Sequence, residues 1–266
     1  MKKLVSYLKL VAAYTRINWL SQTQKEYRGA FLSQFCAMIL NNSTWLSFWL
    51  LFFQRFSIVQ GLESKDVITI WAIASAGFGL ASAFFYNLHN LASLILKGQL
   101  DTWLLYPRAV LPHLALGKMS ATALGDLVFG ILAYLLLVRP DGARMVLFIL
   151  LSAAVALTFI GFNLIRGSLG FYLATAEVLA EQWFISMITF STYPTSLFDG
   201  YARLILYTLI PAVFVAGYPV QALTTLDMAA AGYTLLGSCL FLTIGFFAFS
   251  LGLSRYQSGN LMELRG

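Results

Sequence analysis

Charge is scarce in this sequence. Charged residues make up 11% of its 266 positions, whereas an average soluble domain carries about 25%. Seventeen Lys and Arg and eleven Asp and Glu cannot cover a globule of this size, because hydrophobic residues make up 59% of the chain. The composition excludes a soluble domain and, since the chain is so apolar, a disordered one. It predicts a protein that lies in lipid.

Histidine and cysteine are also rare, and the motifs that hold metals, nucleotides or nucleophiles are missing. The two His and two Cys lack the HExxH or CxxC spacing of a zinc site. Gly117-Lys118 is no phosphate-binding loop, since Met119 follows and no Gly stands five residues before Gly117. No GxSxG elbow is present. The chain is therefore predicted to be no enzyme and to hold no cofactor or metal.

The basic residues flank apolar segments instead of forming a patch with exposed aromatics. Six of the 17 Lys and Arg fall before residue 29. A nucleic-acid-binding protein needs a clustered basic surface, so nucleic acid is not expected as a partner. Anionic lipid headgroups are the expected counter-ions.

Long runs without charge are present, at 29–54, 67–96, 145–165, 204–226 and 228–254. A membrane-spanning helix needs about 20 apolar residues. Two further apolar stretches carry charges, with Lys118 and Asp126 in 112–138 and Glu177 and Glu181 in 168–190. Because backbone groups in lipid must bond within their own segment, we expect helices throughout.

These runs predict an all-α integral membrane protein with a single transmembrane domain, residues 29–252. The predicted spans are about 30–53, 67–88, 113–138, 145–165, 168–190 and 229–252. If the region 194–219 also crossed, there would be seven spans. Pro194, Pro211 and Pro219 interrupt its helices, and a re-entrant element on the outer side leaves more Lys and Arg on the cytoplasmic side. We therefore expect six spans, with both termini and the tail 253–266 in the cytoplasm.

Residues 1–28 are expected to form an amphipathic helix in the membrane interface. Lys2, Lys9 and Arg16 recur every seven residues, close to one stripe of a helix whose remaining surface is mainly apolar. An ordinary solvated leader helix is the alternative.

Three acids fall inside predicted spans: Asp126, Glu177 and Glu181. An ionised carboxylate at that depth costs about 2.5–3.5 kcal/mol on insertion scales, so each should face a partner or a wet cavity. One interpretation places all three on a cation-friendly translocation path. The other makes them structural pairs, for example with Lys118 or Arg166.

Small residues recur every four positions in two of the spans, at Gly117, Ala121 and Gly125 and at Ser75, Gly79 and Ala83. Such faces let helices approach closely. We expect them to pack within the chain, and a dimer face is the alternative.

Three strings, in order along the chain, carry a resemblance to a known family. The first is Gly-x-Leu-Asp-x-x-Leu-x-x-Pro from Gly98 to Pro107; the second is Tyr193 to Phe198, followed by Ile210-Pro211 and Tyr218-Pro219; the third is Arg255-Tyr256-Gln257-Ser258. Together they resemble the permease subunits of ABC-2 type transporters, in the branch of short six-span permeases without a fused ATPase.

The resemblance implies one half of a transporter in the bacterial cytoplasmic (inner) membrane. Two permeases, identical or related, would pair, and two separate cytoplasmic ATPase subunits would hold the ATP and Mg²⁺. The loop 89–112 would contain the coupling helix that docks on the ATPase, with Gly98, Leu100, Asp101, Trp103, Leu104 and Pro107 as its residues. The N-terminal segment would be the connector helix. Tyr193, Pro194, Phe198, Pro211 and Pro219 would form a re-entrant gate.

The substrate is the least determined part of this prediction. An aromatic content of 15% and the three membrane acids favour an amphiphilic small molecule or lipid-like substrate, with a weaker indication of positive charge. The alternative function is an ion-coupled secondary transporter or channel that uses these acids. The sequence shows no internal repeat of spans, which such transporters often carry.

Overall fold

The computed structural model describes residues 2–22, 28–56, 62–107, 109–120, 122–195 and 198–256. The regular structure of these residues is helical, which confirms the all-α prediction. Residues 257–266 of the predicted tail, including Gln257 and Ser258, lie outside the described part of the chain.

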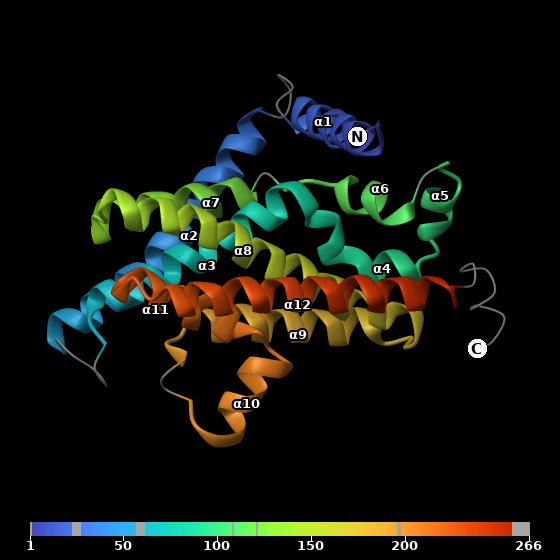
Figure 1. The fold of residues 1–266 in the computed structure, drawn as a ribbon. Coiled ribbons are helices and arrows are strands. Elements are labelled where there is room, and N and C mark those ends of the chain that lie inside the picture. The colour runs from blue at the N-terminus through green and yellow to red at the C-terminus, as the bar shows by residue number, and fades with distance from the viewer. Residues whose placement is uncertain are drawn as a thin grey trace.

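Four long apolar helices run side by side (Figure 1). They are α2 (Arg28–Arg55), α3 (Ser64–Phe85), α8 (Gly142–Gly167) and α12 (Met228–Leu253). The 3₁₀ turn η1 (Tyr86–Asn90) and α4 (Leu91–Leu96) extend α3, and the turn η3 (Ser168–Phe171) extends α8. Each is long and apolar enough to cross a membrane. They cover the predicted spans 30–53, 67–88, 145–165 and 229–252.

The predicted span 113–138 is interrupted. It consists of α6 (Val110–Leu116), α7 (Thr122–Ala133) and the π-helical turn η2 (Tyr134–Val138). Between α6 and α7, the Ser120 amide donates to the Ser82 carbonyl over 3.3 Å, and the Asn87 amide donates to the Lys118 carbonyl over 3.2 Å. The end of α3 thus satisfies backbone groups that a continuous helix would satisfy itself.

The predicted span 168–190 is shorter than expected. The chain leaves η3 after Phe171, and α9 (Ala176–Ser191) is 16 residues long, below the length of about 20 residues that a straight crossing needs. The third and fifth predicted spans therefore remain predictions, and so does the total of six.

The region after α9 is bent. Helix α10 (Gly200–Thr208) projects away from the other helices (Figure 1). The π-helical turn η5 (Val213–Gly217) and α11 (Tyr218–Thr225) follow, at 79° to α10. Pro211 lies in the break, where it can donate no backbone hydrogen bond. The bend suits either a broken span or a re-entrant loop, so the re-entrant element stays a prediction.

The short helices α4, α5 (Leu100–Leu104) and α6 gather at one end of the bundle (Figure 1). Helix α1 (Lys2–Gln22) is tied to this end, since the Tyr14 hydroxyl lies 2.9 Å from His113 Nδ1 and Asn18 donates to the Leu116 carbonyl over 3.2 Å. We call this region the coupling end. The described chain also finishes there (Figure 1).

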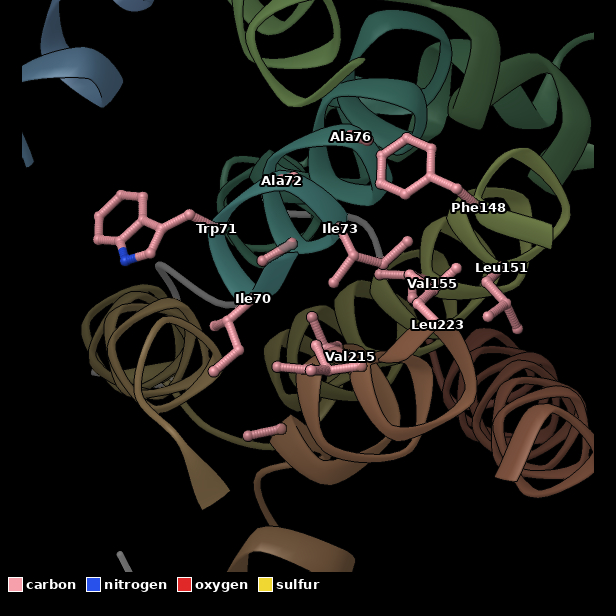
Figure 2. Close-up of a cluster of buried hydrophobic side chains, with 14 of the residues drawn as sticks. Ile70, Trp71, Ala72, Ile73, Ala76, Phe148, Leu151, Val155, Val215 and Leu223 are labelled. Atoms are coloured by element: carbon pink, nitrogen blue, oxygen red, sulfur yellow. The ribbon is translucent and has the colours of Figure 1, made fainter. Parts of the chain in front are cut away.

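Helix α3 is at the centre of the bundle. In Figure 2 its residue Ile73 points toward Phe148 and Val155 of α8, and Val215 of η5 and Leu223 of α11 complete the cluster. The helices come very close. A Cβ on Gly79 would lie 2.4 Å from the Leu127 amide nitrogen, and one on Gly125 would lie 2.6 Å from the Phe35 carbonyl oxygen. The prediction of packing within the chain is confirmed for these two glycines.

Candidate functional site

A cavity of about 440 Å³ lies among α2, α3, α7 and α9. Most of its wall is apolar, and seven aromatic side chains from four helices contribute to it: Trp45, Phe48, Trp49, Trp71, Phe78, Phe159 and Phe184. Phe78 links the rear wall together, with ring centroids 5.6 Å from Phe159 and 5.9 Å from Phe184. The volume falls in the range of about 300–1,000 Å³ that small-molecule sites occupy.

Asp126 of α7 is the one carboxylate among the residues that line this cavity. It is only 4% exposed. Asn42, at the middle of α2, donates from Nδ2 to Asp126 Oδ1 over 2.6 Å and to the Met38 carbonyl over 3.1 Å. Asp126 Oδ2 has no hydrogen-bond partner among the residues that the structure describes. One carboxylate oxygen is thus held in place, and the other is buried without a hydrogen-bond partner within the described chain.

Trp71 also lines the cavity and has a buried polar atom without a partner in the described chain. Its indole lies on the side of α3 opposite Phe148 (Figure 2), and it is part of the cavity wall. Its Nε1 is buried and makes no hydrogen bond within the described part of the chain. Buried indole N–H groups usually have an acceptor, so an unpaired Nε1 in this wall is unusual.

The other two predicted path residues lie elsewhere. Glu177 and Glu181 are in the first turns of α9 and are about half exposed. Glu177 lies 3.4 Å from Lys97, and Glu181 lies 3.4 Å from His89 and 4.0 Å from Arg166. Neither lines the cavity. The structure thus brings both glutamates within 4.0 Å of basic side chains and outside the cavity, and Asp126 is the one of the three acids that lines it. Whether the glutamates belong to a path or to structural pairs stays a prediction.

Arg166 is a buried residue whose importance the sequence did not indicate beyond a pairing with an acid. It is 1% exposed. Its guanidinium donates to Asn163 Oδ1, the Ala180 carbonyl and the His89 carbonyl over 2.8–3.0 Å. It also lies over the Phe184 ring, 4.6 Å from the centroid. Arg166 thus fastens α8 to α9 and to the end of α3, behind one wall of the cavity.

The predicted coupling residues form a compact element at the coupling end. Gly98 has φ +67°, a left-handed conformation that glycine adopts without strain, and it turns the chain from α4 into α5. Leu100 is fully buried in an apolar cluster with the ends of α8 and α12. Trp103 packs against Gly117, where a Cβ would lie 2.7 Å from its indole ring. Leu100 and Trp103 therefore hold the element to the bundle.

The outer face of this element is apolar and exposed. Leu104 and Tyr106 are each nearly half exposed and Leu105 is 86% exposed, and Pro107 is exposed as well. The string Leu104 to Tyr106 is what a partner would meet. The sequence analysis did not include Leu105 and Tyr106 among the coupling residues, and Trp103, which it did include, packs against the bundle.

Asp101 connects the element to the end of the described chain. Burial and the neighbouring Asp101 carboxylate raise the pKa of Tyr256 to about 12. The Tyr256 ring also packs against Phe171, with centroids 6.1 Å apart. Tyr256 belongs to the third string of the resemblance, so two of the three strings meet at the coupling end.

The predicted gate residues are divided between two places. Tyr193 lines the cavity and packs on Trp49, with ring centroids 5.8 Å apart, and Pro194 follows it. Phe198 packs on Phe190 of α9, with centroids 5.3 Å apart. Pro211 and Pro219 flank η5. Their role as a gate stays a prediction.

Comparison with known proteins gives a family. The family model described as ABC-2 family transporter protein matches residues 39–260, which contain most of α2, the other cavity-forming helices and the coupling element. No match was found among curated proteins or among solved structures.

Proposed function

The chain belongs to the ABC-2 transporter family, and on that premise we propose that it is the permease subunit of an ATP-driven exporter in the bacterial cytoplasmic membrane. Members of this family are membrane permeases and are not themselves catalytic. ATP and Mg²⁺ would be held by two ATPase subunits on the cytoplasmic side. A second permease, identical or related, would complete the path, and membrane lipids would surround the pair.

The observation that carries this proposal is the two-sided coupling element. Leu100 and Trp103 fix its inner face in the bundle, whereas Leu104 and Leu105 present an apolar outer face. Exposed apolar side chains that lie together mark sites of contact with a protein or a membrane. A push on this element would be transmitted through Leu100 to α8 and α12 and through Asp101 to the C-terminal segment.

The arrangement of the chain ends supports a cytoplasmic position for both termini. Helix α1 contacts α6 through Tyr14 and His113, and Tyr256 lies beside Asp101. Both ends of the described chain therefore lie at the coupling end. Because the ATPase binds there, that end would face the cytoplasm.

Transport would proceed by alternating access. Closure of the ATPase pair would move the two coupling elements, and the permeases would tilt between inward-open and outward-open states. The ATPase can bias this equilibrium only by contacting the two states differently. The substrate would be an amphiphile, in keeping with the aromatic cavity.

The test is a mild-detergent purification of the tagged chain from its own host, followed by mass identification and an ATPase assay. We expect a stoichiometric ATP-binding subunit with turnover. A chain that purifies alone and shows no nucleotide hydrolysis would overturn the proposal and favour the ion-coupled secondary transporter.

A further inference from the structure

We propose that the cavity among α2, α3, α7 and α9 binds a monovalent organic cation with an aromatic or otherwise apolar body, and that Asp126 is its counter-ion. The statement that this cavity holds the exported substrate rests on the proposed function. Binding of a cation to the cavity can be tested on the permease alone.

The first argument is the state of the Asp126 carboxylate. It is 96% removed from solvent, and Asn42 satisfies only Oδ1. Oδ2 has no hydrogen-bond partner within the described part of the chain, and Asp126 is among the residues that line the cavity. Burying a carboxylate is costly unless a positive charge or hydrogen bonds compensate it. A cation in the cavity would provide that compensation.

The second argument is that the cavity wall supplies no positive charge of its own. Its lining residues in the described chain include no Lys, Arg or His. Arg166 lies against Phe184 of the wall, and its guanidinium is engaged by Asn163, Ala180 and His89. A single carboxylate balances a single charge, so a dication would bring one charge without a counter-ion.

The third argument is the aromatic wall. Trp, Tyr and Phe faces attract cations by about 0.5–2 kcal/mol each when they lie within about 6 Å. Trp45, Trp49 and Trp71 come from two helices that border the cavity, and Phe78 and Phe184 close its rear. An ammonium or phosphonium with apolar substituents matches such a wall, whereas a hydrated metal ion does not.

The opening of the cavity indicates how such a ligand enters. Trp45, Phe48 and Tyr193 are each about half exposed. They line the cavity from α2 and from the end of α9, so the opening lies between these two elements, on the side of the bundle. Asn42, which also lines the cavity, lies near the middle of α2, so the opening is at about that level of the helix. An amphiphilic cation dissolved in the bilayer would therefore reach Asp126 laterally from the lipid, between α2 and the end of α9.

The experiment measures equilibrium binding of radiolabelled tetraphenylphosphonium to the full-length purified chain in nanodiscs. We expect saturable binding to the wild type and about tenfold weaker binding to Asp126→Asn, which corresponds to about 1.4 kcal/mol. Asparagine keeps the shape of the side chain and an oxygen for Asn42. Triphenylphosphine oxide, an uncharged probe with similar rings, should bind both forms within about twofold.

Two further variants complete the experiment, the first as a control and the second as an independent test of the cavity. Glu177→Gln also removes one negative charge, but at an exposed position outside the cavity, so it should leave tetraphenylphosphonium affinity unchanged. Trp45→Leu removes an aromatic face from the rim while Asp126 stays, and it should weaken binding by about threefold. If Asp126→Asn fails to fold, undiminished binding to Trp45→Leu overturns the inference.

The outcomes separate this inference from the proposed function. Equal tetraphenylphosphonium affinity of Asp126→Asn and wild type, or no saturable binding to wild type, overturns the cation site even when the ATPase complex is present. Binding that depends on Asp126 in a chain that recruits no ATPase supports the cation site and contradicts the exporter.

Discussion

Arg166 and Glu181 differ in how deeply they are buried, although the two side chains lie 4.0 Å apart. Arg166 is 1% exposed and its guanidinium holds the carbonyls of Ala180 and His89. About half of the Glu181 side chain is in contact with solvent. Removing the arginine would strand buried acceptors, whereas removing the glutamate would not.

We therefore expect Arg166→Leu to lower the free energy of unfolding by about 3 kcal/mol, and Glu181→Gln to lower it by less than about 1 kcal/mol. Thermal unfolding of both purified variants in one detergent measures the difference. Equal melting temperatures would contradict a structural role for Arg166. Loss of transport in a stable Glu181→Gln variant would return Glu181 to the translocation path.

The sequence predicted which acids needed an explanation, but it did not predict their surroundings. Asp126 and Asn42 are 84 positions apart, and no local pattern indicates that α7 places one against the other. The suggested pairing of Asp126 with Lys118 rested on helical spacing. That spacing fails because the chain is broken between α6 and α7, and Lys118 lies over the Tyr86 ring instead.

At the scale of helices, α8 and α12 approach so closely that glycine is needed at their crossing. A Cβ on Gly245 would lie 2.5 Å from the Gly161 carbonyl oxygen, and a Cβ on Gly161 would lie 2.4 Å from the Phe241 carbonyl carbon. Both contacts are with backbone atoms, which cannot swing away. The two helices would have to separate to admit a methyl group.

Gly245→Ala should therefore destabilise the chain by about 2 kcal/mol through overpacking. Gly232→Ala is the matched control, because Gly232 is on the same helix with open space around its Cβ position. That variant should be neutral or more stable by up to about 1 kcal/mol, since alanine favours helix. Unfolding in a denaturing detergent series compares the two. Similar stabilities would mean that the helices can separate at little cost.

The helices that the sequence predicted well are those with long uninterrupted apolar runs. Helices α2, α8 and α12, and α3 together with its extension η1, cover their predicted ranges because lipid solvation alone requires each run to be helical. The run 113–138 is also apolar, yet it breaks where Trp103 packs on Gly117 and Ser82 accepts from Ser120. These contacts come from distant segments, so composition could not reveal the interruption.

At the scale of the whole molecule, the coupling end joins parts that are far apart in the sequence. Tyr14 of α1 contacts His113 of α6, Trp103 of α5 packs on Gly117, and Asp101 lies beside Tyr256. The family resemblance predicted the coupling helix in this segment of the chain. It could not tell which side chains face inward, because that depends on how α5 is rotated on the bundle.

The inward and outward faces of α5 should be separable by mutation. In the double variant Leu104→Ser, Leu105→Ser we expect unfolding stability within about 0.5 kcal/mol of wild type, since both side chains are exposed. ATPase association should weaken by at least about tenfold, because apolar anchors dominate such interfaces. Co-purification of the ATPase at graded concentrations measures the loss.

Trp103→Ala is the matched comparison on the same helix. It removes an indole from the cluster that joins α5 to the ends of α8 and α12, so it should cost about 3 kcal/mol of stability. If the double serine variant bound ATPase as wild type does while Trp103→Ala lost it without any loss of stability, the partner would contact the inward face. The orientation of the coupling element would then differ from the one that the structure places at the end of the bundle.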